Sequence, residues 1–122
     1  MLDYFDSGAG RGPYATYVGG KLPRIPCKVD AMRATSTIQV ENDRVIVTEW
    51  RFAPGADTGY HVHSHPYVVV PLTTGTLRLE DAQGEREASL EAGASYARPA
   101  GVSHNVINPN GFEFRFVEIE IK

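Results

Sequence analysis

The sequence predicts an all-β protein whose strands form a sandwich or a closed jelly roll. Runs rich in Val, Ile, Thr, Tyr and Phe recur at short intervals from residue 36 onward. Turn-forming residues separate these runs, and no segment keeps the 3.6-residue period of an amphipathic helix. Many short strands with regular turns are typical of these two architectures.

The expected strands follow one another along the chain with a turn after most of them. They cover residues 37–40, 45–52, 67–72, 76–79, 87–90, 95–97, 105–107 and 112–121. The turns are expected at residues 41–43, 53–55, 73–75, 82–84, 92–93 and 108–111, where Gly, Pro, Asn and Asp gather.

The last expected strand carries its apolar residues on two faces. Phe112, Phe114 and Phe116 share one face of an extended chain, whereas Ile119 and Ile121 lie on the other. Because strand side chains alternate with a period of two, either a bulge near Val117 or a change of covered face is required. The strand could then leave the core for a second contact between subunits, or it could be buried on both faces.

Length and composition exclude several classes of protein. A chain of 122 residues is expected to form one domain with a sizeable core, and its formal net charge of −3 gives no basic surface for nucleic acid. The first residues are acidic where a secretory signal is basic, and no apolar stretch approaches the roughly 20 residues that span a bilayer. We therefore expect a cytoplasmic protein with no membrane partner. Cys27 is the single cysteine, so an internal disulfide is excluded.

We expect residues 1–34 to form an N-terminal arm and residues 35–122 to form the barrel. Residues 7–30 are rich in Gly and Pro and show little periodicity. This composition favours a segment that lies over the barrel or over a partner subunit rather than a layer of the core.

All four histidines of the chain fall within two short patterns. His61 and His63 are two residues apart, so on a strand both imidazoles leave the same face, with Cα atoms about 7 Å apart. His104 follows a Pro-x-Gly turn and belongs to a different strand. Neutral histidines bind Fe, Ni, Zn and Cu well, so we expect one of these divalent ions on His61, His63 and His104.

The two patterns resemble the motifs of the cupin superfamily. Its second motif, Gly-x5-Pro-x-Gly-x2-His-x3-Asn, matches at Gly93, Pro99, Gly101, His104 and Asn108. Its first motif, Gly-x5-His-x-His-x3-4-Glu-x6-Gly, matches at Gly55, His61, His63 and Gly75 but lacks the glutamate. The glutamate position holds Tyr67 or Val68, depending on the spacer. The resemblance implies a double-stranded β-helix, or jelly-roll, cupin barrel, and because cupins commonly dimerise it also implies a homodimer, in which the arm could be exchanged.

The missing glutamate leaves the coordination of the ion open. Three neutral ligands would leave the full charge of a divalent ion, which acidifies bound water and attracts anions. Tyr67 could act as a phenolate ligand, as a hydrogen-bond donor to bound oxygen, or as packing. His65 would lie about 13 Å from His61 in a regular strand, but Pro66 makes a kink plausible. His65 could thus be a fourth ligand, a residue at the cavity mouth, or exposed.

Five residues are candidates for catalysis or substrate binding. Tyr96 and Arg98 share one strand face just before the second motif's turn, and Tyr67 and Tyr96 are the candidate acid and base. Arg51, Arg98 and His65 are the candidate substrate-binding residues, since an inward arginine binds a carboxylate through two hydrogen bonds. Trp50 and Phe52 are expected in the core.

The resemblance leads to three hypotheses about function. The first is a small metal-dependent enzyme, of dioxygenase type or using the ion as a Lewis acid, that acts on a small anionic or chelating metabolite. The sequence is most similar to the stand-alone small cupins associated with β-alanine and amino-acid catabolism. The second is a non-enzymatic module that senses or stores a ligand or a metal. The third is a metal-free isomerase or lyase that uses tyrosines and a histidine.

Overall fold

The computed structural model describes residues 32–122, and the compact unit Ala34–Lys122 consists of strands and connecting loops. Most of the expected arm of residues 1–34, including Cys27, lies outside the described residues. No helix of the described residues is long and apolar enough to cross a membrane. The nine strands of this part of the chain are β1 (Thr35–Glu41), β2 (Val45–Phe52), β3 (His61–Val62), β4 (Tyr67–Pro71), β5 (Gly75–Asp81), β6 (Gly84–Leu90), β7 (Tyr96–Arg98), β8 (Ser103–Ile107) and β9 (Phe114–Ile121).

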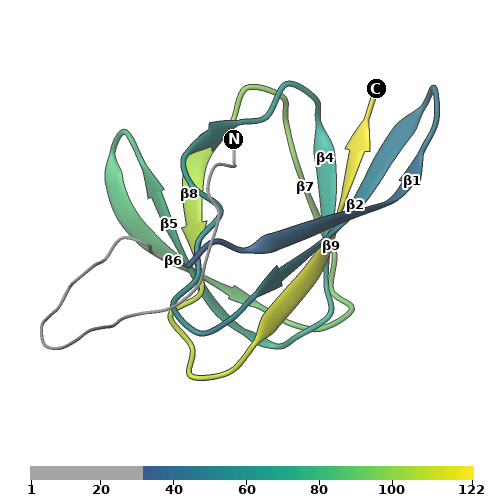
Figure 1. Cartoon of the computed structure of the whole chain (residues 1–122). Helices are drawn as coiled ribbons and strands as arrows, with labels where there is room; N and C mark the ends of the chain where they lie inside the picture. Colours follow the sequence, from purple (N-terminus) through teal and green to yellow (C-terminus); the bar gives the residue numbers. More distant parts are fainter. Residues whose placement is uncertain (1–31) are drawn as a thin grey trace, which may run out of the picture. The chain divides into compact units, whose positions relative to one another are not determined.

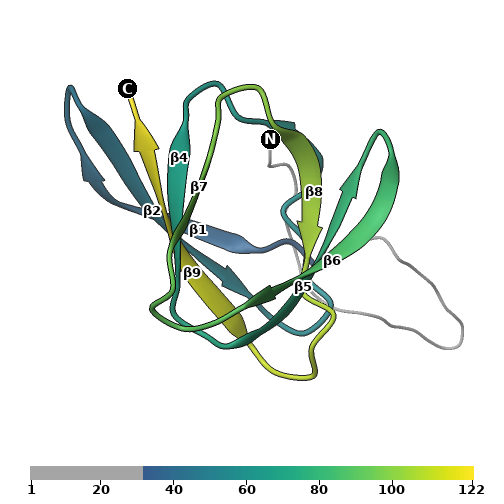
Figure 2. The same cartoon turned by 180° about the vertical axis from the view of Figure 1, so that it is seen from behind.

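The strands form two sheets in which every neighbouring pair is antiparallel. One sheet has the order β1-β2-β9-β4-β7 and the other has the order β3-β8-β5-β6. Figure 1 shows the two sheets facing each other with the chain crossing between them, and Figure 2 shows the same arrangement from behind. The expected all-β jelly roll is therefore confirmed.

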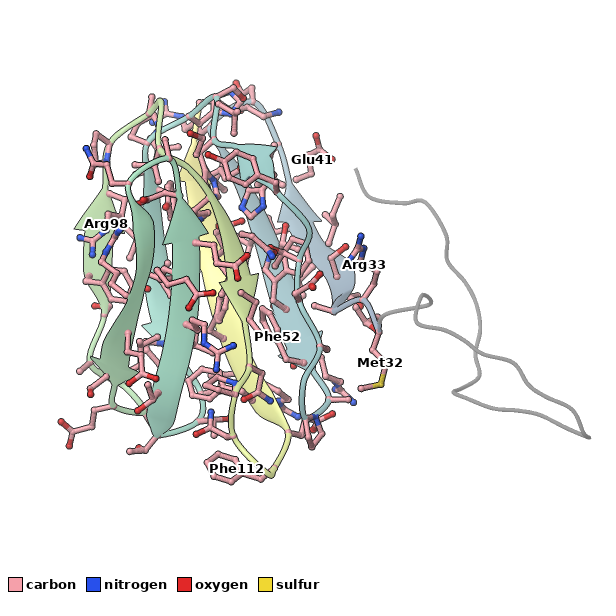
Figure 3. All side chains as sticks on the ribbon, turned by 90° about the vertical axis from the view of Figure 1, so that its left-hand side faces the viewer. Met32, Arg33, Glu41, Phe52, Arg98 and Phe112 are labelled. Atoms are coloured by element: carbon pink, nitrogen blue, oxygen red, sulfur yellow. The ribbon has the colours of Figure 1, made fainter. Side chains whose placement is uncertain are left out.

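The core lies between the sheets and is built from the inward residues of β2, β4, β5 and β9. Phe52 and Phe114 are completely buried and Leu77 nearly so. The Phe52 ring packs against Phe116 with ring centroids 5.5 Å apart. Figure 3 shows Phe52 in the middle of the barrel and Phe112 at its lower end. Apolar residues at every second position of these strands thus close one end of the barrel.

Motif glycines and an asparagine close the loops around this core. A Cβ atom on Gly75 would come within 3.2 Å of the Phe114 ring, so only glycine fits there without displacement. The buried Asn108 side chain donates to the carbonyl oxygens of Phe52, Ala53 and Phe112. These contacts join the end of β2 to the loop before β9, which explains why the motif carries an asparagine.

β9 keeps a regular alternation over its whole length. Its pairing with β2 runs from Phe114 to Ile121 without a register shift, so there is no bulge near Val117. Phe114 and Phe116 are buried in the core, and the next inward positions are Glu118 and Glu120, whereas Ile119 and Ile121 face away from the core. Phe112 lies before the strand and is half-exposed, so its expected place on the Phe114 face was wrong.

Candidate metal centre

Three histidines converge at one end of the barrel, beyond the aromatic core. The Nε2 atom of His63 lies 3.0 Å from the Nε2 atom of His61 and 3.2 Å from the Nε2 atom of His104. His63 and His104 are buried, and His61 is half-buried. Together they form a group of ligand atoms that could hold one metal ion.

Backbone pairing brings the two motifs together. His61 of β3 stands directly opposite His104 of β8. Past the end of β3, the amide of His63 donates to the carbonyl of Val102, and the amide of Gly101 donates to the carbonyl of His63. Gly101 adopts φ of 94°, a conformation that residues with a Cβ atom rarely adopt. The Pro-x-Gly turn of the second motif thereby fixes the position of His63.

The hydrogen bonds around the rings favour metal binding. The Nδ1 atom of His61 lies 2.9 Å from the carbonyl oxygen of Gly59, which only accepts, so Nδ1 carries the proton and Nε2 carries a lone pair. The Nδ1 atom of His63 faces the carboxylates of Glu118 and Glu120 at 3.7 and 3.9 Å, which favours the same tautomer. Two lone pairs at 3.0 Å repel each other unless a cation lies between them.

The nitrogen separations also suit an ion. Nitrogens that bind one ion at about 2.1 Å lie about 3.0 to 3.4 Å apart, for angles between octahedral and tetrahedral. The separations of 3.0 and 3.2 Å from His63 to its neighbours fall in this range. The three residues therefore fit a divalent transition metal, whose preferred ligands include neutral imidazoles.

Burial keeps these histidines neutral, as metal ligands must be. Desolvation, followed by the proximity of His61 and His104, lowers the pKa of His63 to about 3. Desolvation is also the main cause that lowers the pKa of His104 to about 4 and the pKa of His61 below 6.5. Little proton competition for the lone pairs is therefore expected near neutral pH.

Tyr67 occupies the motif's glutamate position and packs against a histidine. Its ring is buried and stacks on the His63 ring, with centroids 3.9 Å apart and an angle of 19° between the planes. Burial, together with the charge of Glu118, raises the pKa of the Tyr67 phenol above its ordinary value of 10. Its hydroxyl thus stays protonated, which argues against a phenolate ligand and for packing or hydrogen-bond donation. Val68, the other candidate for this position, faces outward.

A carboxylate of β9 lies on the far side of His63. Glu118 is buried, and the Trp50 indole donates to its Oε1 atom at 3.3 Å. Burial and the neighbouring Glu120 raise the pKa of Glu118 to about 7, although the Trp50 hydrogen bond acts in the opposite direction. The motif analysis did not identify either glutamate. Their parity with Phe114 and Phe116 was a signal that could have placed both on the inner face.

Two further candidates, Tyr96 and Arg98, lie on β7. Tyr96 is half-buried opposite Val69, and Arg98 stands opposite Tyr67, so both belong to the inward face of β7. The Arg98 guanidinium lies 5.0 Å from the centre of the Tyr96 ring and is exposed, at the edge of the barrel in Figure 3. Burial raises the pKa of the Tyr96 phenol.

Two candidates are not brought into the histidine group. Arg51 is exposed on the outward face of β2 and forms ion pairs with Glu49 and Glu113. His65 is half-buried, and its Nδ1 atom lies 3.3 Å from the Ser64 hydroxyl. The ligand atoms that converge in the described residues are those of His61, His63 and His104, and His65 is not among them.

Comparison with known proteins agrees with this fold and motif arrangement. The model of the Cupin domain family matches residues 48–120 of the chain. The chain belongs to the cupin family. A curated relative, the Beta-alanine degradation protein BauB of Pseudomonas aeruginosa, is 63% identical over 90 residues, which cover 74% of this cupin and 95% of the relative.

Solved cupin structures show the same barrel. A cupin domain from Bordetella pertussis Tohama I is 59% identical, with a TM-score of 0.75 over 75% of this chain and 96% of that one. The polyketide cyclase RemF of Streptomyces resistomycificus is 24% identical, with a TM-score of 0.61 over 75% of this chain and 66% of that one, and shares the fold alone. The expected double-stranded β-helix of a cupin is thus confirmed, and so is the similarity to small cupins of β-alanine catabolism.

Proposed function

We propose that this cupin binds one divalent ion, Fe, Ni, Zn or Cu, on the Nε2 atoms of His61, His63 and His104. The observation that carries the proposal is the convergence of these nitrogens at 3.0 and 3.2 Å while the Nδ1 atoms of His61 and His63 face acceptors. When bound, the ion supplies Lewis-acid chemistry or activates oxygen.

The proposed activity is that of an enzyme on a small anionic or chelating metabolite. Tyr67 and Tyr96 are neutral phenols on the inner faces of β4 and β7, where they can hold or donate a proton. The exposed Arg98 guanidinium beside Tyr96 suits a substrate carboxylate. The similarity to BauB favours a step in the degradation of β-alanine or a related amino acid, and with it the expected cytoplasmic location.

Metal analysis of protein without a histidine tag tests the site. After reconstitution with each ion in turn, one equivalent is expected in the parent protein. His104→Ala should abolish binding, because the remaining two ligands cannot close the coordination sphere. His65→Ala is the matched control, since His65 lies outside the group, and it should retain the ion. Sub-stoichiometric metal in the parent protein with all four ions would overturn the proposal.

Assays on the loaded protein then test the activity. β-Alanine and short amino and oxo carboxylic acids are incubated with it, and oxygen uptake and products are measured. Turnover that Arg98→Ala reduces mainly through KM supports the enzyme. Binding of such acids without turnover would instead support the non-enzymatic alternative, and turnover by protein stripped of metal would support the metal-free isomerase or lyase.

We also propose that the chain forms a homodimer through the outer face of the five-stranded sheet. Val40, Val47, Ile119 and Val68 stand side by side across four strands on this face. Val40 is half-exposed, and the half-exposed Ile121 extends the apolar surface. Charges of both signs border it, because Glu49 pairs with Arg51 and Arg115, so two copies need not repel each other.

Light scattering at micromolar concentration tests the dimer. The parent protein is expected to have twice the mass of the chain, and Ile119→Asp is expected to give the monomer with its strands intact by circular dichroism. A monomeric parent protein would reject the homodimer and would favour coverage of this face by another segment of the chain. We further propose that residues 1–34 form an arm that contributes to the dimer. Removal of residues 1–30 should then weaken dimerisation, while the barrel of residues 35–122 stays folded.

A further inference from the structure

The Glu118 carboxylate is buried next to a proposed metal ligand. Its side chain is 10% exposed, and its Oε2 atom lies 3.7 Å from the Nδ1 atom of His63. The other oxygen, Oε1, accepts the hydrogen bond from the Trp50 indole. A buried carboxylate is costly unless charges or donors compensate it. Glu118 thus contacts Trp50 with one oxygen and His63 with the other. The opposite nitrogen of the His63 ring, Nε2, faces the proposed metal site.

The position of this carboxylate excludes direct binding to the same ion. The Nε2 atom of His63 faces His61 and His104, whereas Nδ1, on the other side of the ring, faces Glu118. Tyr67 covers one face of the same ring. Glu118 therefore restrains the Nδ1 edge of the His63 ring and Tyr67 restrains one of its faces. The described contacts of these two residues do not include the three Nε2 atoms.

We propose that Glu118 is a positioning residue of the metal centre, which acts on the ion through His63 and supplies from β9 a carboxylate where the first motif lacks its own. The inference rests on the proposed metal site. A carboxylate near Nδ1 favours the tautomer with the proton on that atom, orients the ring and makes Nε2 a more basic ligand. At 3.7 Å the Oε2 atom lies just beyond hydrogen-bond distance of the neutral imidazole, and a small rotation of the Glu118 side chain would form the hydrogen bond.

Glu120 contributes to the same field more weakly. Its Oε2 atom lies 3.9 Å from the Nδ1 atom of His63, but its side chain is 23% exposed, so water screens its charge more strongly. The register places Glu120 opposite Tyr67 and Glu118 opposite Val69 on the neighbouring strand β4. The carboxylates thus lie one strand away from the position where the motif would have its own glutamate.

The test measures Zn²⁺ affinity in the full chain by competition with a chelator. Glu118→Gln keeps the size of the side chain and an oxygen that can accept from Trp50, but removes the charge. Loss of such an outer partner costs metal affinity about 10- to 100-fold, and this is the loss expected here, with the stoichiometry still one ion per chain. Glu120→Gln should reduce affinity less.

Glu49→Gln is the matched control. It removes the same charge from a mostly buried carboxylate on the neighbouring strand β2, where Glu49 faces outward and pairs with Arg51 and Arg115. Its Zn²⁺ affinity should equal that of the parent protein. If the parent binds none of Fe, Ni, Zn or Cu, the proposed metal site itself fails. If the parent binds one ion and Glu118→Gln binds it equally well, only the positioning role fails.

Fluorescence gives a readout that a merely structural role would not change. Trp50 is the single tryptophan of the chain, and its indole nitrogen donates to Glu118. Zn²⁺ has no d-electron transitions that quench the indole, so a change in Trp50 emission on binding reports the carboxylate's response. The change should be clear in the parent and reduced in Glu118→Gln at saturating Zn²⁺. An equal change in both proteins, or two ions bound per chain of the parent, would overturn the positioning role.

Discussion

Replacing Asn108 with alanine should destabilise the barrel strongly, although this residue does not reach the metal centre. The side chain is completely buried. Its Nδ2 atom donates to the carbonyls of Phe52, Ala53 and Phe112 at 3.2, 3.3 and 2.9 Å, and its Oδ1 atom accepts from the amide of Asn110 at 2.9 Å. Alanine removes these four contacts and a fifth, the hydrogen bond from the Nδ2 atom of Asn110 to Oδ1 at 2.7 Å, and it leaves a void.

The magnitude follows from which partners can reach water. Ala53 and Phe112 are exposed residues whose carbonyls can be hydrated, but Phe52 is completely buried. A buried polar group without a partner costs about 1 to 3 kcal/mol, and the lost bonds and packing add to it. We expect a loss of about 3 kcal/mol, which for a domain of this size lowers Tm by roughly 12 to 24 °C.

Urea and thermal denaturation of the metal-free protein measure this loss. Asn42→Ala is the control, because Asn42 also accepts two backbone hydrogen bonds, from Arg44 and Val45, but in an exposed turn. Its cost should stay below about 1 kcal/mol, since water replaces the lost acceptor. Equal destabilisation by the two substitutions would refute the reasoning that burial makes the motif asparagine important.

Three further predictions concern the site. The pKa values of about 3 for His63 and about 4 for His104 in the folded protein lie below the ordinary histidine value of 6.5. The unfolded chain therefore binds more protons than the folded one in acid, so the metal-free protein should lose stability as pH falls from about 6.5 toward 4. Glu118, with its pKa raised to about 7, acts in the opposite sense over the same range. Glu118→Gln should therefore steepen the loss of unfolding free energy with falling pH, as measured by urea titrations at a series of pH values. An unchanged dependence on pH would contradict this. Gly101→Ala forces φ near 94° on a residue with a Cβ atom. It should lower the free energy of unfolding by about 1 to 2 kcal/mol and weaken Zn²⁺ binding. Unchanged Zn²⁺ affinity would show that the turn does not position His63. Tyr67→Phe should keep Zn²⁺ affinity because the ring still stacks, whereas Tyr67→Leu should lower it, and a loss with Phe as large as with Leu would point to the hydroxyl.

Much of the fold could be predicted from local patterns, because strand alternation and turn chemistry act over a few residues. The region expected at residues 45–52 coincides with β2. β3 was not among the expected strands, since His61–Val62 is too short to show alternation, and it is held by pairing with β8 over a long sequence separation. β5 and β6 extend further than expected because each supplies the other with hydrogen-bond partners up to the turn at Gly84.

The histidine group could be predicted because its members have a fixed spacing in the sequence. Spacing alone could not place Arg51, whose direction depends on the parity of β2, and the parity puts it on the outer face. Spacing also could not place His65, because this residue lies in the loop between β3 and β4, where side chains do not alternate regularly. Glu118 was overlooked because the motif places its glutamate after the His-x-His pair, whereas here the carboxylate comes from a strand that is distant in the sequence and adjacent in the sheet.

The location of the Glu118 carboxylate bears on the class of substrate that we propose. The resemblance implies that the glutamate of the first cupin motif is itself a ligand, which would lower the net charge of the ion. In this chain Tyr67 takes that position and stays neutral, while Glu118 lies behind His63, away from the converging nitrogens. A carboxylate there can strengthen the ligand without occupying a coordination position or facing an incoming anion. Together with the exposed Arg98 on the inward face of β7, this arrangement is the reason that the proposed substrates are small anions.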